Sequence, residues 1–485
     1  MSLRFHNQLS KQVDDFTPQV DGKVSLYTCG PTVYSYPLIG NWTSYIYWDL
    51  LVRVLQANGL SVERVMNITD VGHLVSDGDD GEDKLEVGAK REGKTAWEVA
   101  EFYTKDFMNG LKRLNLIVPT HITKATNYIE EQLELVRVLK NKGFTYQIDD
   151  GIYFDTAKFP SYAKFADLDL EAQRAGARVE FNPEKRNHSD FALWKFTPAG
   201  ETRDMEWETP VDLIDETEER LGFPGWHLEC SAMAMSILGN TLDIHTGGID
   251  HIPVHHTNEI AESEAATGEQ FAHFWLHNNH LMSEGAKISK SLGNGYTLDD
   301  IEEKGHSLMA FRLFVLQSHY RTESNFTFEN LTAAENRLLN WRNIAALRHQ
   351  IHDTLQDDNS KSDDDVLSLY AASRKLIEVV SDDLDTPAAF ALIDDAFSRI
   401  QGANIDTIHR HALTSFIDTI DEVLGLDLLG STSDISDELK RTIIERERAR
   451  ENKDWQAADR LRETIEKDGI TVRDTANGSI WEYTA

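Results

Sequence analysis

A strand, a loop, a helix and a second strand follow one another closely near the N-terminus, and this unit constrains the fold most strongly. Residues 23–29 (KVSLYTC) predict a short buried strand, and residues 30–41 form a loop punctuated by glycine and proline. A stretch with helical spacing of apolar residues follows, and residues 61–69 predict the next strand. Such a unit opens a parallel sheet of the nucleotide-binding type, whose ligands sit beyond the carboxyl ends of the strands. Cys29 and Thr69 are both expected at that edge.

The length of the chain predicts three or four domains, because 485 residues exceed what one ordinary core accommodates. There is no uninterrupted apolar run of 18 residues, so no membrane-spanning segment is expected. The first residues (MSLRFHNQLSKQVDDF) lack the apolar middle of a signal peptide. A cytoplasmic location is the expectation that follows.

The formal net charge of −34 argues against indiscriminate binding to nucleic acid. A large structured RNA partner is compatible with this net charge, because local patches of positive charge determine the contacts with RNA. Residues 440–462 contain eight lysines and arginines against five acidic residues, a local surplus of three positive charges. A solvated helix stabilised by i,i+4 ion pairs explains this surplus equally well.

A second motif, KISKS, runs from Lys287 to Ser291. Lys287 and Lys290 lie three positions apart on a Gly/Ser-flanked loop, so both can point at one polyanion. Such a loop could stabilise the charge that develops on a triphosphate as pyrophosphate leaves. The alternative is a solvated loop without a ligand. The sheet pattern before the motif and the all-helical pattern after it favour the functional interpretation.

Cysteine and histidine supply candidate metal ligands. Cys29 and Cys230 are the only cysteines, too few for a disulfide framework in a chain of this length. The segment HIPVHHTNE contributes His255 and Glu259, which lie on one face if a helix begins there. Two thiolates, an imidazole and a carboxylate make a plausible tetrahedral zinc set. Two isolated buried thiols are the competing interpretation. His227 and His256 are expected to be ordinary core or hydrogen-bonding histidines.

Taken together, these segments resemble one known family. YTCGPTVYSYPLIGN, NITD, GWHLECSAM, GGIDHIPVHHTNE and KISKSLGN occur in the order and approximate spacing of the cysteinyl-tRNA synthetases, a class I family. DFALWK and the C-terminal ADRLRETIEKDGITVRDTANGSIW are also similar to that family. The resemblance extends from about Leu26 to Trp481. It implies a cysteine–tRNA ligase, with ATP, L-cysteine and tRNA(Cys) as partners, Mg²⁺ bound with ATP, and a monomeric state.

The resemblance also implies residue roles. Zinc, one ion per chain, would be held by Cys29, Cys230, His255 and Glu259, and would select the cysteine thiolate over a serine hydroxyl. The amino-acid and ATP pocket would be lined by Gly30, Thr69, Trp226 and Asp250. The catalytic groups toward the phosphates would be Gly40, Asn41, Lys287 and Lys290. For Trp226, simple core packing is the alternative.

The chain departs from the family at the class I His-x-Gly-His signature, where it has Leu38, Ile39, Gly40 and Asn41. Gly40 allows close approach to ATP, and Asn41 can donate a hydrogen bond near a helix N-terminus. Leu38 can donate none, and losing one donor to a transition-state phosphate typically costs about 10²–10³ in rate. Either another group compensates, or the chain is a non-catalytic tRNA-binding paralogue. The intact KISKS motif and metal-ligand set favour the enzyme.

The predicted fold class is α/β. A Rossmann-like catalytic domain with a parallel sheet spans residues 1–120 and 191–280, and a connective subdomain is inserted at 121–190. The KISKS loop and a stem-contact region occupy 281–325, a helical tRNA-binding bundle 326–429, and a small anticodon-binding domain 436–485.

One further enzyme class resembles the catalytic half of the chain. It is the ligase that joins cysteine to an amino-sugar, and it lacks the C-terminal domain. The presence of residues 436–485 therefore argues against this alternative. Trp455 and Trp481 in that domain could stack on an RNA base, although packing is the more ordinary role. Residues 75–83 predict an acidic surface loop without an assigned role.

Overall fold

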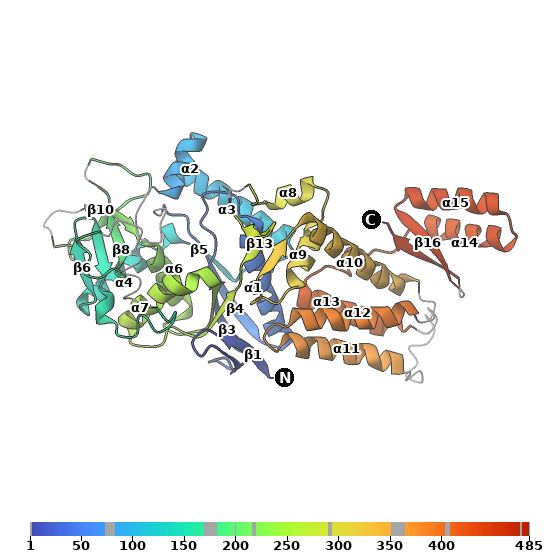
Figure 1. Ribbon diagram of the computed structural model, residues 1–485, viewed down its shortest axis with the longest axis horizontal. Coiled ribbons are helices and arrows are strands. Elements are labelled where there is room, and N and C mark those ends of the chain that lie inside the picture. The colour runs from blue at the N-terminus through green and yellow to red at the C-terminus, as the bar shows by residue number, and fades with distance from the viewer. Residues whose placement is uncertain are drawn as a thin grey trace.

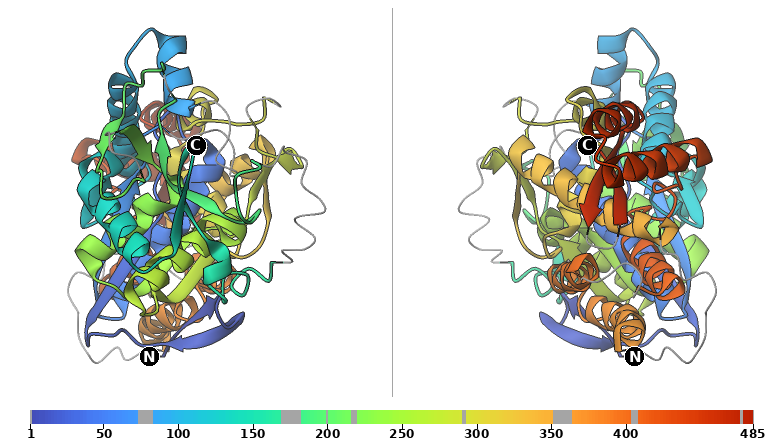
Figure 2. Two further views of the ribbon diagram at one scale, coloured as in Figure 1. Left: turned by 90° about the vertical axis from the view of Figure 1, so that its left-hand side faces the viewer. Right: turned by 90° about the vertical axis from the view of Figure 1, so that its right-hand side faces the viewer.

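The protein is an elongated α/β molecule whose N-terminal residues lie near the middle of the long axis and whose C-terminal domain lies at one end (Figure 1). The computed structural model describes residues 2–72, 83–168, 182–198, 200–215, 220–289, 293–350, 364–402, 408–475 and 478–484. The end views in Figure 2 show an inserted subdomain at one end and the C-terminal domain at the other. Within the described residues, no helix combines the length and the apolar character needed to cross a membrane.

A five-stranded parallel sheet forms the centre of the catalytic half. Its order is β12-β11-β3-β4-β5, and each neighbouring pair is parallel. The strands are β3 (Lys23–Thr28), β4 (Ser61–Ile68), β5 (His121–Lys124), β11 (Leu242–Gly248) and β12 (Ala272–Asn278). Nearly every residue of β11 is buried, as expected for a parallel strand covered on both faces. The predicted α/β class with a parallel sheet is confirmed.

Helix α1 (Ile39–Ala57) connects β3 to β4 and is buried along most of its length. Apolar residues occupy nearly all sides of it, which is the pattern of a helix enclosed by other elements. Helices α2 (Lys84–Glu92) and α3 (Ala96–Arg113) follow, and α6 (Trp226–Leu238) and α7 (Thr257–Thr267) complete the catalytic half. A hairpin of β1 (Leu3–Asn7) and β2 (Gln12–Phe16) precedes the sheet.

The inserted subdomain has boundaries different from the predicted ones. Its sheet is antiparallel, with the order β6-β7-β8-β10-β9, and helix α4 (Ile129–Asn141) packs beside it. The strands are β6 (Thr145–Ile148), β7 (Gly151–Phe154), β8 (Phe191–Phe196), β9 (Trp207–Thr209) and β10 (Arg220–Pro224). The segment around 191–196 therefore pairs within the insertion, whereas residues 121–124 form the edge strand of the parallel sheet. The prediction placed residues 121–124 in the insertion and residues 191–196 in the catalytic domain. It was wrong for both, because strand propensity does not reveal which partner a strand will pair with.

After the catalytic half, a small sheet leads into helices. Strands β13 (Leu281–Ser283), β14 (Ala286–Lys287) and β15 (Ser324–Phe326) form this sheet around the start of the KISKS motif. The helices are α8 (Leu298–Glu303), α9 (Leu308–Leu316), α10 (Phe328–Ala346), α11 (Asp364–Val380), α12 (Thr386–Gly402) and α13 (Arg410–Leu424). The C-terminal domain has α14 (Asp437–Glu451), α15 (Trp455–Lys467), β16 (Ile470–Thr475) and β17 (Gly478–Tyr483).

The predicted acidic loop at 75–83 lies outside the described residues except for its last member. Asp83 is buried and caps α2 by accepting hydrogen bonds from the backbone N–H groups of Leu85 and Glu86. It also forms an ion pair with Arg203. Asp83 is therefore a structural cap, not a loop residue at the surface.

A buried ion pair joins the catalytic helix α1 to the helical bundle. Asp49 on α1 and Arg312 on α9 are both fully buried and bond to each other. Arg312 also donates to the backbone carbonyl oxygens of Leu424 at 2.7 Å and Leu114 at 3.0 Å. Although burial opposes ionisation, Arg312 and Arg53 hold the pKa of Asp49 below its ordinary value. One guanidinium thus connects α1, the end of α3 and the end of α13.

Removing that guanidinium should destabilise the protein. Arg312→Met leaves a buried carboxylate short of one partner and strands two buried carbonyl groups. We expect the free energy of unfolding to fall by about 3 kcal/mol in denaturant titration. Arg374→Met, on the exposed side of α11, should change it by less than about 0.5 kcal/mol. Equal stability of both variants would show that the junction is dispensable.

Candidate active site

A cavity of about 410 Å³ opens at the carboxyl edge of the parallel sheet. The residues that line it come from the ends of β3, β4 and β11, the first turns of α1 and α6, and the start of the KISKS segment. The predicted site residues in its wall are Cys29, Gly30, Gly40, Asn41, Thr69, Trp226, Cys230, Asp250, His255 and Lys287. Glu259 is fully buried outside the lining, and Lys290 lies outside the described residues.

Gly30 is required by close contact within the protein. A Cβ atom at this position would lie 1.7 Å from the backbone oxygen of Asn67 on β4. The Gly30 N–H donates to the side-chain oxygen of Asn67 at 2.7 Å. The turn after β3 therefore rests directly on β4, and this contact sets the position of Cys29. A glycine needed for ligand approach and one needed for this packing look the same in the sequence.

Thr69 is held by two polar neighbours that the sequence analysis did not identify. Its hydroxyl accepts a hydrogen bond from Asn67 Nδ2 at 3.1 Å and donates to Glu229 Oε2 at 3.1 Å. Glu229 is fully buried and directly precedes Cys230 on α6. The only sequence signal for it was its position inside GWHLECSAM, where a helix-surface role was equally compatible.

The four predicted metal ligands come together. One candidate ligand atom each of Cys29, Cys230, His255 and Glu259 lies within 4.8 Å of the others, and all four residues are buried. Cys29 follows β3, and Cys230 lies on α6. His255 belongs to a π-helical turn (Ile252–His256), and Glu259 lies in the first turn of α7. His255 Nε2 is 2.8 Å from Glu259 Oε1, which is the i,i+4 relation that the sequence predicted. Single π-helical turns are frequent at functional sites.

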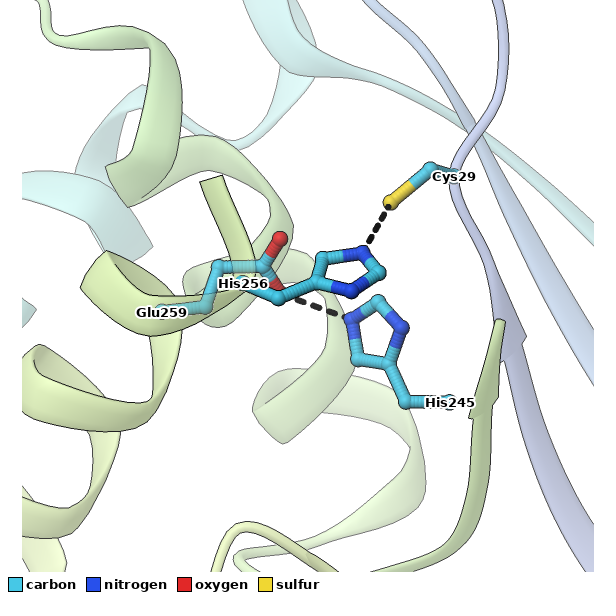
Figure 3. A group of neighbouring side chains, drawn as sticks. All are labelled: Cys29, His245, His256 and Glu259. Carbon is cyan, nitrogen blue, oxygen red and sulfur yellow. Dashed lines mark hydrogen bonds and ion pairs between the residues drawn. The ribbon is translucent and has the colours of Figure 1, made fainter. Parts of the chain in front are cut away.

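A second, overlapping group consists of Cys29, His245, His256 and Glu259 (Figure 3). His245 Nε2 is 2.7 Å from Glu259 Oε2, and His256 Nε2 is 3.4 Å from Cys29 Sγ. The other ring nitrogen of His256 is 2.8 Å from His277 Nε2. His245 and His277 were not identified from the sequence. His256 was interpreted as a hydrogen-bonding histidine, and it makes such contacts.

The two groups differ in their access to the cavity. Cys29 and Glu259 are shared by both groups; of the other members, Cys230 and His255 line the cavity, whereas His245 and His256 do not. A cation bound by the first group would therefore face a ligand in the cavity. One bound by the second group would lie behind the wall.

Burial and mutual proximity set the charge of this cluster. Burial raises the pKa of the Cys29 thiol, while hydrogen bonding with Cys29 and then burial raise that of Cys230. Burial opposes ionisation of Glu259, but His245 and His255 hold its pKa well below the ordinary value. Burial lowers the pKa of His256, and the neighbouring histidines lower it further. A buried carboxylate with two thiols and an imidazole fits a soft or borderline divalent cation such as zinc, which stabilises thiolates.

Trp226 is not a simple core residue. It is partly exposed in the cavity wall, and its ring stacks on His255 with a centroid distance of 4.5 Å and an interplanar angle of 29°. Asp250 is exposed at the cavity, in the short turn after β11. The stacking of Trp226 restricts the orientation of the His255 ring.

Leu38 has a packing role at the signature position. A Cβ atom on Gly295 would lie 2.7 Å from Leu38 Cδ1, so the leucine contacts the segment that follows KISKS. The N–H of Ile39 donates to the carbonyl oxygen of Tyr296 at 2.8 Å. Asn41 Oδ1 accepts a hydrogen bond from the Leu38 N–H at 2.9 Å, which leaves its amide Nδ2 available to a ligand. The start of α1 and the KISKS segment are therefore packed together.

Comparisons with known proteins agree with the geometry. Residues 15–336 match a family model described as the class I (C) tRNA synthetase catalytic domain, and residues 432–481 match the cysteinyl-tRNA ligase anticodon binding domain. A cysteine–tRNA ligase 1 of Burkholderia lata is 41% identical over 482 residues, covering 99% of this chain and 96% of the relative. A cysteine–tRNA ligase of Treponema denticola is 38% identical over 504 residues, covering 99% of this chain and 100% of the relative.

Solved structures share the fold at low sequence identity. Mycobacterium tuberculosis methionyl-tRNA synthetase bound by methionyl-adenylate has a TM-score of 0.60 at 14% identity, with 85% of this chain and 93% of that chain covered. The LeuRS of Agrobacterium radiobacter K84, in a ternary complex, has a TM-score of 0.61 at 12% identity, with 87% of this chain and 86% of that chain covered. The alternative of a non-catalytic paralogue finds no support in the full-length relatives. With a catalytic-domain match over 15–336 and relatives aligned end to end, this chain belongs to the cysteine–tRNA ligase family of class I aminoacyl-tRNA synthetases.

Proposed function

We propose that this chain activates L-cysteine with ATP and transfers it to the 3′-terminal adenosine of tRNA(Cys), using zinc to select the cysteine thiolate. The observation that carries the proposal is one cavity with two chemically different ends. One end has the N-terminus of α1 and Lys287, which suit phosphates. The other end has Cys29, Cys230 and His255, which suit a thiol ligand through a metal.

Activation is assigned to the phosphate end. The backbone N–H of Gly40 and the side-chain amide of Asn41, both at the start of α1, can donate to ATP phosphates, which carry Mg²⁺. Gly40 has little room for a side chain, because a Cβ atom there would lie 3.2 Å from Ile288. Lys287 lines the cavity, and Lys290 is proposed from the motif alone. In-line attack of the cysteine carboxylate on the α-phosphate would give cysteinyl-adenylate, with both lysines stabilising the departing pyrophosphate.

Selection of the amino acid is assigned to the other end. We favour Cys29, Cys230, His255 and Glu259 as the zinc ligands, because three of them line the cavity and two thiolates match the preference of zinc. When bound there, zinc would accept the substrate thiolate as a further ligand, which the harder, less acidic serine hydroxyl does poorly. Shape alone discriminates such similar side chains weakly.

The rest of the amino acid would be positioned by Thr69, Trp226 and Asp250. The Asp250 carboxylate is exposed to the cavity and suits the substrate ammonium group. Thr69, fixed between Asn67 and Glu229, presents its hydroxyl at the same wall. Trp226 covers His255 and narrows the space beside the thiols.

The tRNA would contact the helical bundle and the C-terminal domain. Trp481 is buried in the core of that domain, whereas Trp455 is 58% exposed at the start of α15 and is available to stack on a base. Class I membership implies that the 2′-hydroxyl of the terminal adenosine attacks the adenylate. Cytoplasmic location and a monomeric state stay predictions from the sequence.

Cysteine-dependent exchange between ATP and pyrophosphate tests the proposed activity. Zinc-loaded protein should exchange with cysteine and give no exchange above background with serine, because only the thiolate can become a soft ligand. Removal of zinc by a chelator should abolish exchange, and added zinc should restore it. Folded, zinc-bound protein that fails to exchange, or that uses serine equally well, would contradict the proposal.

The choice of ligand set makes a separate prediction. Cys230→Ala should lose stoichiometric zinc in metal analysis after dialysis, since Cys230 belongs only to the proposed set. His256→Gln is the matched control, because His256 belongs only to the second group, and it should retain one zinc. Retention by Cys230→Ala together with loss by His256→Gln would identify the second group as the site.

A further inference from the structure

An exposed aromatic surface lies at the mouth of the catalytic cavity. Phe102 on α3 is 43% exposed, and Tyr36 in the loop before α1 is 40% exposed. Their ring centroids are 6.1 Å apart, and Tyr36 also packs edge-on against Tyr103 at 5.1 Å. Tyr36 is at the same time part of the cavity wall. We call Tyr36, Phe102 and Lys94 the aromatic platform.

Local structure holds Lys94 over this platform. Gly93 ends α2 in the left-handed region with φ of 65°, and Thr95 caps α3 by accepting from the N–H of Glu98. Lys94 lies in the tight turn between these two positions. Its Nζ is 4.8 Å from the centroid of the Phe102 ring. A cation and two exposed aromatic side chains are thereby placed side by side.

Two acidic residues beside the platform, Glu92 and Glu101, are already paired with cations. Glu92 forms ion pairs with Arg91 at 3.1 Å and with Lys94 at 3.2 Å. Glu101 forms ion pairs with Lys124 at 2.8 Å and with Lys105 at 3.2 Å. These four cations reduce the repulsion that a phosphate would otherwise meet on this strongly acidic protein.

We propose that the aromatic platform binds the unpaired 3′ end of the tRNA, immediately before its terminal adenosine enters the cavity; this rests on the proposed function. Single-stranded nucleic acid binds where bases stack on aromatic side chains and cations contact the backbone phosphates. Because Tyr36 belongs to both the platform and the cavity wall, a strand lying on Phe102 continues directly into the cavity. Helices α2 and α3 also lie along the same upper edge of Figure 1 as α8 and the C-terminal domain, so one long RNA could contact both ends.

The test separates the transfer step from the activation step. Phe102→Leu keeps an apolar side chain but removes the ring, so kcat/KM for tRNA in aminoacylation should fall about tenfold. Cysteine-dependent pyrophosphate exchange, which needs no tRNA, should stay at the wild-type rate. Phe102→Trp retains a ring and should restore charging. The control is Trp97→Leu, an equally exposed aromatic on the same helix that packs against Trp207 instead, and it should charge normally.

A tRNA that lacks its unpaired 3′ end locates the contact. Wild type and Phe102→Leu should bind this truncated tRNA equally, while full-length tRNA should bind the variant more weakly. Normal charging by Phe102→Leu would overturn the proposal. So would an equal loss of exchange, which would assign the ring to the ATP side, or equal weakening with truncated tRNA. Wild-type protein without exchange or charging would instead overturn the proposed function.

Discussion

The active centre depends on one buried negative charge, the carboxylate of Glu259. Its two oxygens face His245 and His255 at 2.7 and 2.8 Å, and its side chain is fully buried. A buried charge is stable only when an opposite charge or hydrogen-bond donors lie next to it. The histidines supply part of this compensation, whereas the pKa of the adjacent Cys29 thiol is raised by burial and that of the Cys230 thiol by hydrogen bonding with Cys29 and by burial. The cluster is therefore a candidate cation site at the carboxyl edge of the sheet.

Helix α1 contacts both the catalytic cavity and the helical bundle, and so fixes their relative position. The N-terminus of α1 forms the end of the cavity proposed for phosphates, and Leu38 and Ile39 connect it to the segment after KISKS. Further along the same helix, Asp49 is fixed to Arg312 and through it to the helical bundle. The leucine in the first signature position thus has an observable role in packing, and Asn41 lines the cavity while its Oδ1 accepts from the Leu38 N–H.

The sequence predicted those features that depend on local pattern or on long motifs. The β3–α1–β4 unit followed from hydrophobic spacing and from the glycines and prolines of its loop, and the grouping of Cys29, Cys230, His255 and Glu259 followed from the family motifs. Strand pairing was not predictable, so β5 and β8 were assigned to the wrong sheets. Asn67, Glu229 and His245 were missed because they act through contacts between distant segments. In the sequence alone, nothing distinguishes such a buried polar residue from other polar residues of the same strand or helix.

X-ray absorption spectroscopy at the zinc edge tests the central claim most directly, namely that the metal held by Cys29 and Cys230 selects cysteine by its sulfur. Without substrate, the zinc-loaded protein should show two sulfur ligands at about 2.3 Å together with nitrogen and oxygen ligands. Added cysteine should raise the sulfur count by one, and added serine should leave it unchanged. A sulfur count that does not change with cysteine, or a single sulfur in the free protein, would contradict the account.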